Sequence, residues 1–261
     1  MSIYLKTPDE IAIMREAGRI VARAHQAMRE AVRPGVSTAE LDKIAETVIR
    51  DHGATPSFLG YPKTGAPNYP ASINASINDE LVHGLPSPTR LLKEGDIISL
   101  DTACHYQGFV ADAAFTMGVG EIKPSVQRLV DTTEKALYVA IDESVIPNTV
   151  RDVALATQAF AEKHGYSVAR EYTGHGVGRS MHEEPQVPNW WPRRVQRRGW
   201  ENYKLQPGMT YAIEPMLITG RSDLEELDDG WTVVTKDHSL CAHWEHTIAI
   251  TEGKPIILTL P

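Results

Sequence analysis

The sequence predicts one α+β domain in which helices cover an antiparallel sheet. Three observations support this class: apolar residues recur at helical spacing behind capping motifs, an apolar stretch reads as a β-hairpin, and the same order of parts occurs twice. With 261 residues, the chain is long enough to bury a sizeable core. We expect a single catalytic domain over residues 1–261, made of two pseudo-symmetric halves of about 1–120 and 121–261.

The composition is that of a globular protein, with 42% hydrophobic and 23% charged residues. The formal charge of −8 argues against general nucleic-acid binding. The first residues do not resemble a secretory signal, and no apolar run approaches the roughly 18 residues of a membrane span. Two distant cysteines, Cys104 and Cys241, predict packed thiols rather than a disulfide. We therefore expect a cytoplasmic protein with no membrane association, and a monomer by default.

Capping motifs mark the helices. The segments Thr7–Glu10 and Ser37–Glu40 are capping boxes that open two helices in the first half. In the second half, Thr149–Asp152 is a similar start, and Ser125 is expected to cap the helix before it. Each half is thus predicted to contribute a helix pair.

The segment 95–115 is predicted to form a hairpin that carries two acids. We expect strands over 97–104 and 109–116, with the turn centred between residues 106 and 107. That register places Asp101 directly opposite Asp112, with Cβ atoms roughly 5 Å apart. Two carboxylates at this distance repel each other unless a cation lies between them. The alternative is that both acids lie on a solvated face without function.

An internal duplication extends this pattern. Each half has a helix pair, then a His-Gly pair, then a turn glycine with an acid six residues later, and then a second acid in a β-rich segment. The corresponding residues are His83 and His175, Gly95–Asp101 and Gly208–Glu214, and Asp112 and Glu245. Halves that pack about a pseudo-twofold axis would bring these acids and histidines together at their seam.

Four carboxylates in one pocket would carry a charge of about −4, which two divalent cations would neutralise. Oxygen ligands with an imidazole suit Mn, Co, Fe, Zn or Ni. A water that bridges two such ions loses its proton readily and becomes a nucleophile for an amide or ester carbonyl. His83 lies among apolar residues beside a glycine, so a purely structural role is its alternative.

These residues resemble a known family, the type I methionine aminopeptidases. The resemblance extends from KTPDEIAIMREAG to WEHTIAITEGKPIIL, and its most specific motifs are LDTACHYQGFVADAAFT, GHGVGRSMHEEPQV, LQPGMTYAIEPM and DGWTVVTKDHSL. It implies the pita-bread fold, a pseudo-twofold α/β architecture. It also implies removal of the initiator methionine from nascent proteins with a small second residue, by attack of a metal-bridging hydroxide.

The resemblance assigns roles to residues at matching positions. Glu214 is the implied general base, His83 contacts the scissile amide and helps to protonate the leaving amine, and His182 binds the substrate carbonyl. Trp231 and Met181 are expected to line the pocket for the methionine side chain, with Phe58 and Tyr61 as further candidates. The implied metal ligands are Asp101, Asp112, His175, Glu214 and Glu245, with Asp112 and Glu245 bridging.

The chain departs from the family in three places. The segment GYPKTGAPNYPASINASIN is longer and richer in proline than usual and has no cysteine, so pocket residues before His83 are uncertain by sequence alone. Met181 stands where an aromatic residue is common, and Trp231 has core packing as its alternative role. The segment Trp190–Trp200 contains three tryptophans and four arginines, which indicates either a transient ribosome contact or a solvated loop.

The chain length and the ligand positions also bear on alternative functions. A proline-specific peptidase of this fold usually carries an additional N-terminal domain, whereas only about 80 residues precede His83. Type II methionine aminopeptidases usually insert a helical subdomain, for which 214–245 leaves little room. A non-catalytic binding module on this fold could lose ligands without losing its core, and a metal-independent amidinohydrolase would be expected to lack most of the five ligands. Because all five ligand positions are filled, the sequence favours a dinuclear metal aminopeptidase.

Overall fold

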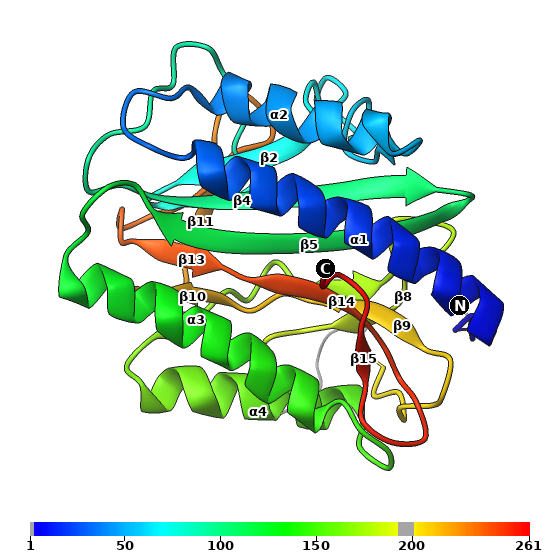
Figure 1. Cartoon of the computed structure of the whole chain (residues 1–261). Coiled ribbons are helices and arrows are strands. Elements are labelled where there is room, and N and C mark those ends of the chain that lie inside the picture. The colour runs from blue at the N-terminus through cyan, green and yellow to red at the C-terminus, as the bar shows by residue number, and fades with distance from the viewer. Residues whose placement is uncertain (1–2, 193–200) are drawn as a thin grey trace.

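The computed structural model describes residues 3–192 and 201–261, and within them four helices cover one face of a nine-stranded sheet (Figure 1). The helices are α1 (Pro8–Ala31), α2 (Thr38–Asp51), α3 (Pro124–Glu143) and α4 (Val150–Lys163). The strands are β1 (Thr55–Pro56), β2 (Ile73–Ile77), β3 (Glu80–Val82), β4 (Ile97–Tyr106), β5 (Phe109–Gly118), β6 (Ser167–Val168), β7 (Gly174–Gly176), β8 (Glu183–Val187), β9 (Thr210–Ile213), β10 (Met216–Ile218), β11 (Leu224–Glu226), β12 (Val233–Thr235), β13 (Cys241–His243), β14 (Glu245–Ala249) and β15 (Ile256–Ile257).

Three of the four predicted helix starts are confirmed. The side chains of Thr7, Ser37 and Thr149 each accept a hydrogen bond from the backbone three residues on, and each capping box is complete. The prediction for Ser125 is wrong, because α3 begins at Pro124 after Lys123, which makes no side-chain cap. Proline has no N–H to satisfy and already has a helical φ, so the helix begins two residues earlier than a cap at Ser125 implied.

The hairpin forms, but its register differs from the prediction. The turn consists of Gln107 and Gly108, whose φ angles are 48° and 83°, as two-residue hairpin turns of type I′ require. Asp101 is therefore opposite Ala114, and Asp112 is opposite Ala103. The shift moves each pairing by two residues, so both acids still point to the same face of the sheet, as diagonal neighbours.

The sheet joins strands from distant parts of the sequence. Its order is β1-β4-β5-β14-β9-β7-β8, with β2 also on β4 and β15 also on β14. Ala114 of β5 is opposite both Asp101 of β4 and Glu245 of β14, so these residues form one row across three strands. Ala212 of β9 is likewise opposite His175 of β7. The register therefore gathers the predicted ligands on one face, although the pseudo-twofold relation of the halves remains a prediction.

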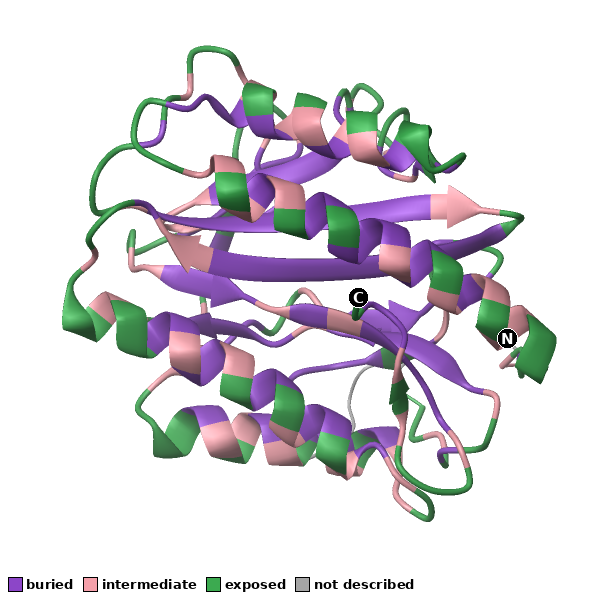
Figure 2. Ribbon diagram, viewed as in Figure 1, coloured by how far each residue is buried: buried purple, intermediate pink, exposed green. Residues whose placement is uncertain are grey.

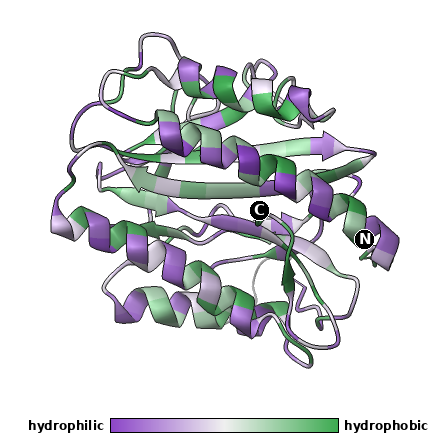
Figure 3. Ribbon diagram, viewed as in Figure 1, coloured by the Kyte–Doolittle hydropathy of each residue, from purple (hydrophilic) through white to green (hydrophobic). Residues whose placement is uncertain are grey.

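The helices bury one side against the sheet and leave the other exposed. Figure 2 shows purple, buried surfaces on α1 and α3 turned toward the strands, and Figure 3 shows polar and apolar residues alternating around these helices. The core beneath α1 includes Ala17, Val21, Met28, Leu100 and Phe115, all at most 1% exposed. Both cysteines are free and buried, which confirms the prediction of packed thiols. Across 3–192 and 201–261, the structure has no helix with the length and apolar character of a membrane span.

The C-terminal segment packs closely on α1 at Gly18. A methyl group at Gly18 would overlap the backbone carbonyl of Leu258, whose N–H donates to Thr247. We expect Gly18→Ala to lower the free energy of unfolding by about 1–3 kcal/mol, because overpacking outweighs the higher helix propensity of alanine. Urea denaturation measures this. Gly253→Ala is the control, since its methyl would meet only Thr251 Oγ1 at 3.9 Å; equal stability of the two variants would contradict the close contact.

Candidate metal and substrate site

All eleven residues that the sequence nominated line a single cavity on the sheet face opposite the helices. Six further residues complete its wall. The predicted residues are Phe58, Tyr61, His83, Asp101, Asp112, His175, Met181, His182, Glu214, Trp231 and Glu245, and the additional ones are Tyr69, Asn74, Val82, Tyr172, Thr173 and His243.

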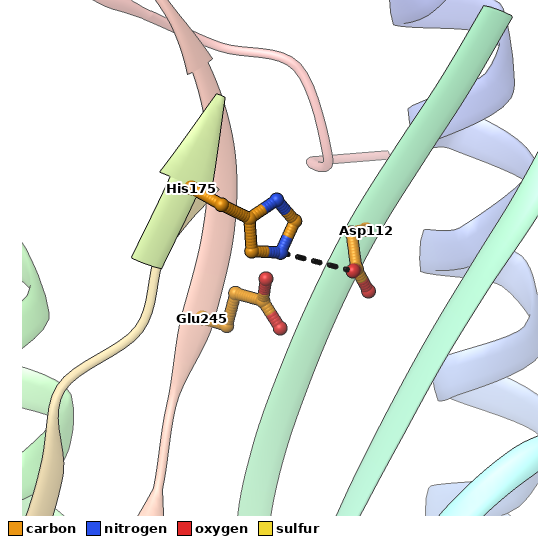
Figure 4. Close-up of side chains that lie close together, drawn as sticks. All are labelled: Asp112, His175 and Glu245. Atoms are coloured by element: carbon orange, nitrogen blue, oxygen red, sulfur yellow. Dashed lines mark ion pairs between the residues drawn. The ribbon is translucent and has the colours of Figure 1, made fainter. Parts of the chain in front are cut away.

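The candidate ligands come from five segments that the sheet brings together. Asp101 lies in β4, Asp112 in β5, His175 in β7 and Glu245 in β14, while Glu214 directly follows β9. Figure 4 shows Asp112, His175 and Glu245 pointing toward one another from three strands. Each of these three offers a ligand atom, and the atoms all lie within 4.8 Å of one another. This spacing is compatible with coordination of one shared ion.

His175 is oriented for coordination through Nε2. Its Nδ1 donates a hydrogen bond to the backbone carbonyl of Gly176 at 3.0 Å, which leaves the Nε2 lone pair free. Nε2 lies 3.7 Å from Glu214 Oε1 and 3.9 Å from Asp112 Oδ2. Burial lowers the pKa of His175 to about 3, so the imidazole is neutral, as a metal ligand must be.

The carboxylates repel one another in a buried space. Burial raises the pKa of Asp101 to about 6. Burial, followed by the charge of Glu245, raises the pKa of Asp112 well above its usual range. Burial and the neighbouring acids raise the pKa values of Glu214 and Glu245 in the same way. Ionising all four groups together therefore requires a compensating positive charge.

The polar atoms of the cavity fit a divalent cation. Asp101 Oδ1, Asp112 Oδ1 and Glu245 Oε1 are buried and have no hydrogen-bond partner among the described residues. No lysine or arginine appears in the cavity wall, as far as 3–192 and 201–261 are concerned. Buried acidic oxygens without partners, beside a neutral imidazole, are the donor set that divalent ions take. The solvated-face alternative for Asp101 and Asp112 is wrong, since they are 9% and 2% exposed.

His83 and His182 occupy different parts of the cavity wall. His83 follows β3 with a φ of 61°, and its ring lies 5.5 Å from that of Tyr172 and 6.3 Å from that of Trp231. His182 has its ring 4.3 Å from that of His175, and its Nδ1 lies 2.7 Å from the Tyr61 hydroxyl. Burial lowers the pKa of His83 to about 4 and also lowers that of His182. Both side chains are thus neutral imidazoles at the cavity surface.

Aromatic side chains form the apolar part of the wall. The Trp231 ring lies 5.0 Å from the Tyr69 ring, and its Nε1 donates to the Pro67 carbonyl at 2.9 Å. Phe58, Tyr69 and Met181 belong to the same buried cluster. Trp231 therefore both packs in this cluster and faces the cavity. The long proline-rich segment before His83 does contribute to the cavity, through Phe58, Tyr61 and Tyr69.

His243 is the functional candidate that the sequence reasoning passed over. Its Nε2 lies 3.6 Å from Glu214 Oε2 and 3.9 Å from Glu245 Oε2. The available signal was its spacing of two from Glu245 in the sequence. The chain changes sheets between β13 and β14, so this spacing does not by itself place both side chains in the cavity. The Thr247 hydroxyl hydrogen-bonds the backbone of Asp112.

Part of the tryptophan- and arginine-rich segment can be located. The Trp190 Nε1 donates to the Arg170 carbonyl at 3.1 Å, and the Arg170 guanidinium lies 5.2 Å from the Trp190 ring centre. Trp191 is buried among residues of α3 and α4. Residues 193–200, with all four arginines of the predicted ribosome contact, lie outside the described residues.

Fold and site together define a metallopeptidase. The chain belongs to metallopeptidase family M24, whose model matches residues 12–252. Within this family it is similar end to end to methionine aminopeptidases. It is 46% identical to methionine aminopeptidase 1 of Bacillus subtilis, over 98% of this chain and 99% of that protein, and 45% identical to methionine aminopeptidase of Aquifex aeolicus, over 99% of both.

Solved structures agree with this placement. The methionine aminopeptidase of Thermotoga maritima superposes with a TM-score of 0.92 at 39% identity, over all of both chains. The prolidase of Pyrococcus furiosus gives a TM-score of 0.76 at 21% identity, and this chain covers 65% of it. The prolidase likeness shows only the shared fold. These neighbours confirm the predicted pita-bread fold, here with an antiparallel sheet covered by four helices in the described part of the chain.

Proposed function

We propose that this chain removes the N-terminal methionine from nascent proteins and peptides whose second residue is small. The observation that carries the proposal is the single cavity in which buried acids and histidines adjoin an apolar, aromatic wall. The end-to-end similarity to methionine aminopeptidases supports the same reaction. The acids provide a place for metal-assisted hydrolysis, and the apolar wall provides a place for the methionine side chain.

The proposed ligand set holds two divalent ions, because four buried carboxylates carry about twice the charge of one such ion. Asp112, His175, Glu214 and Glu245 would hold one ion, and Asp101, Asp112 and Glu245 the other. Ions held there would supply polarisation of the scissile carbonyl and would lower the pKa of the attacking water. The donor set accommodates Mn, Co, Fe, Zn or Ni.

Three side chains of the cavity have separate roles in proton transfer and hydrogen bonding to the substrate. Glu214 has its carboxylate between His175 and His243, and it accepts the proton of the attacking water. When the Tyr61 hydroxyl donates to Nδ1 of His182, the ring carries its proton on Nε2, which then donates to the substrate carbonyl oxygen. His83, on the aromatic side of the cavity, hydrogen-bonds the scissile amide and assists departure of the amine.

Release of methionine from Met-Ala-Ser tests the proposed function. We expect the metal-loaded enzyme to release free methionine from Met-Ala-Ser, and to cleave Met-Glu-Ser at least tenfold more slowly because the second side chain is large. Free methionine is quantified by mass spectrometry across a series of Mn, Co, Fe, Zn and Ni. Ala-Pro serves as the control substrate for a proline-specific peptidase. Cleavage of Ala-Pro without cleavage of Met-Ala-Ser would overturn the assignment.

The proposed partner is the amino terminus of a newly made chain. Ribosomes produce such termini in the cytoplasm, which we propose as the compartment. A transient ribosome contact through Trp190–Trp200 remains a prediction. Ribosome sedimentation with a variant that lacks the charges of Arg193, Arg194, Arg197 and Arg198 tests it, and unchanged co-sedimentation would contradict it.

A further inference from the structure

Asn74 is directly opposite Asp101 in the sheet and holds its carboxylate. The two residues are cross-strand partners in β2 and β4, so their side chains point to the same face. Asn74 Nδ2 donates a hydrogen bond to Asp101 Oδ2 at 2.6 Å. Asn74 is 3% exposed and also lines the cavity. The pair is therefore buried at the edge of the candidate metal centre.

Few other groups orient Asp101. On the other edge of β4, Asp101 is opposite Ala114 of β5, whose side chain has no polar atom. Its remaining hydrogen-bonding partners are the side chain of Asp112, itself a candidate ligand, and the backbone of Thr102. Asp101 Oδ1 has no partner among the described residues. The amide of Asn74 thus occupies Oδ2 and leaves Oδ1 for an ion.

Asp101 lies outside the compact group of ligand atoms formed by Asp112, His175 and Glu245. In the two-ion arrangement proposed above, Asp101 would hold the ion that His175 does not hold. A neutral amide suits this position, because it orients a carboxylate without adding a positive charge that would compete with the cation. Partners of this kind fix the geometry of a ligand and so set metal affinity.

The start of β2 is itself anchored to α2. Asp42 Oδ1 accepts hydrogen bonds from the backbone N–H groups of Ser72 at 2.7 Å and Ile73 at 3.0 Å. The Tyr69 hydroxyl donates to the Ile73 carbonyl at 3.1 Å. These bonds hold the backbone next to Asn74, so its amide has a fixed place from which to direct Asp101.

We propose that Asn74 is a positioning residue for Asp101 and sets the affinity of the ion on the Asp101 side of the site. The proposal rests on the two-ion arrangement of the proposed function. It predicts that Asn74 acts only through Asp101. A role in packing alone would instead affect both ions or the stability of the fold.

A double-mutant cycle with Mn²⁺ tests this role. Apo-protein is titrated calorimetrically as wild type, Asn74→Leu, Asp101→Ala and the double variant; leucine keeps the branching and the number of side-chain heavy atoms of asparagine and removes its donor. We expect two binding events in the wild type, and a loss of about 10–100-fold in the affinity of one event in Asn74→Leu. Asp101→Ala should abolish that same event. The double variant should match Asp101→Ala, since coupled residues are not additive.

Asn148→Leu is the matched control, because Asn148 Nδ2 donates to Glu143 Oε1 at 2.8 Å outside the cavity. It should leave both events unchanged. Unchanged affinities in Asn74→Leu, an equal loss in both events, or a further loss in the Asp101→Ala background would each overturn the proposal. Should Asn74→Leu fail to fold, Asn74→Ser enters the same cycle. If the wild type binds only one ion, the two-ion arrangement is refuted. The same cycle then tests whether Asn74→Leu lowers the affinity of that single binding event through Asp101.

Discussion

Glu214→Gln is expected to lower kcat for Met-Ala-Ser by about 10²–10⁴-fold, the usual contribution of a general base. The amide of glutamine cannot accept the proton of the attacking water. The substitution also removes one of the negative charges that would hold the ions in the proposed ligand set. The variant should stay folded, because burial and neighbouring acids raise the pKa of Glu214 in the ion-free protein and removal of this charge relieves their repulsion. Steady-state kinetics at saturating metal measures the effect.

Glu184→Gln is the matched control for this substitution. Glu184 lies in β8 and does not belong to the cavity wall. The same loss of a carboxylate should therefore leave kcat near that of the wild type. Circular dichroism and thermal unfolding check that both variants are folded. A Glu214→Gln enzyme with wild-type kcat would rule out the general-base role, whatever its metal content.

Removal of the metal with a chelator is expected to abolish cleavage and to destabilise the fold at neutral pH. Ions that bind only the folded protein add about 2.7 kcal/mol to the free energy of unfolding when their concentration is 100 times Kd. Without them, the four buried acids repel one another across β4, β5, β14 and the end of β9. Thermal unfolding before and after dialysis against the chelator measures the difference, and restoring the metal should restore both stability and activity.

The stability of the metal-free protein should fall as the pH rises. The folded-state pKa of Asp101 is raised from 3.8 to about 6, so its stabilising contribution is complete below 3.8 and is lost as the pH passes 6. Asp112, Glu214 and Glu245 have pKa values raised in the same direction and extend the loss to higher pH. Metal binding must displace these protons, so the increase in Tm on adding Mn²⁺ should be larger at pH 7 than at pH 5. An equal increase in Tm at pH 5 and pH 7 would contradict the displacement of protons from these acids by the metal.

Local signals in the sequence predicted the helices well and the hairpin turn less well. A capping box places its own partner three residues away, so Thr7, Ser37 and Thr149 could be identified without the rest of the fold. The turn at Gln107 and Gly108 depends on positive φ angles that glycine favours and glutamine tolerates only in context. The register error arose there, and it did no harm to the site because a shift of two residues preserves the face.

Residues whose position in the cavity depends on strand pairing were harder to predict. The candidate ligand acids could be selected because their charges need compensation and their spacing repeats, and the structure places them in one cavity. His243 and Asn74 carry no such signal, since their roles arise from a change of sheet after β13 and from the pairing of β2 with β4. The register of two strands decides which residues are cross-strand partners. Neighbouring residues in a single sequence do not reveal that register.

The row formed by Asp101, Ala114 and Glu245 across β4, β5 and β14 has a consequence for biosynthesis. Its last member is translated more than a hundred residues after its first. While β14 is still inside the ribosome, β5 lacks the neighbour that supplies Glu245, and the proposed ligand set is incomplete. We therefore expect a partly synthesised copy of this chain to be inactive until β14 has added to the sheet.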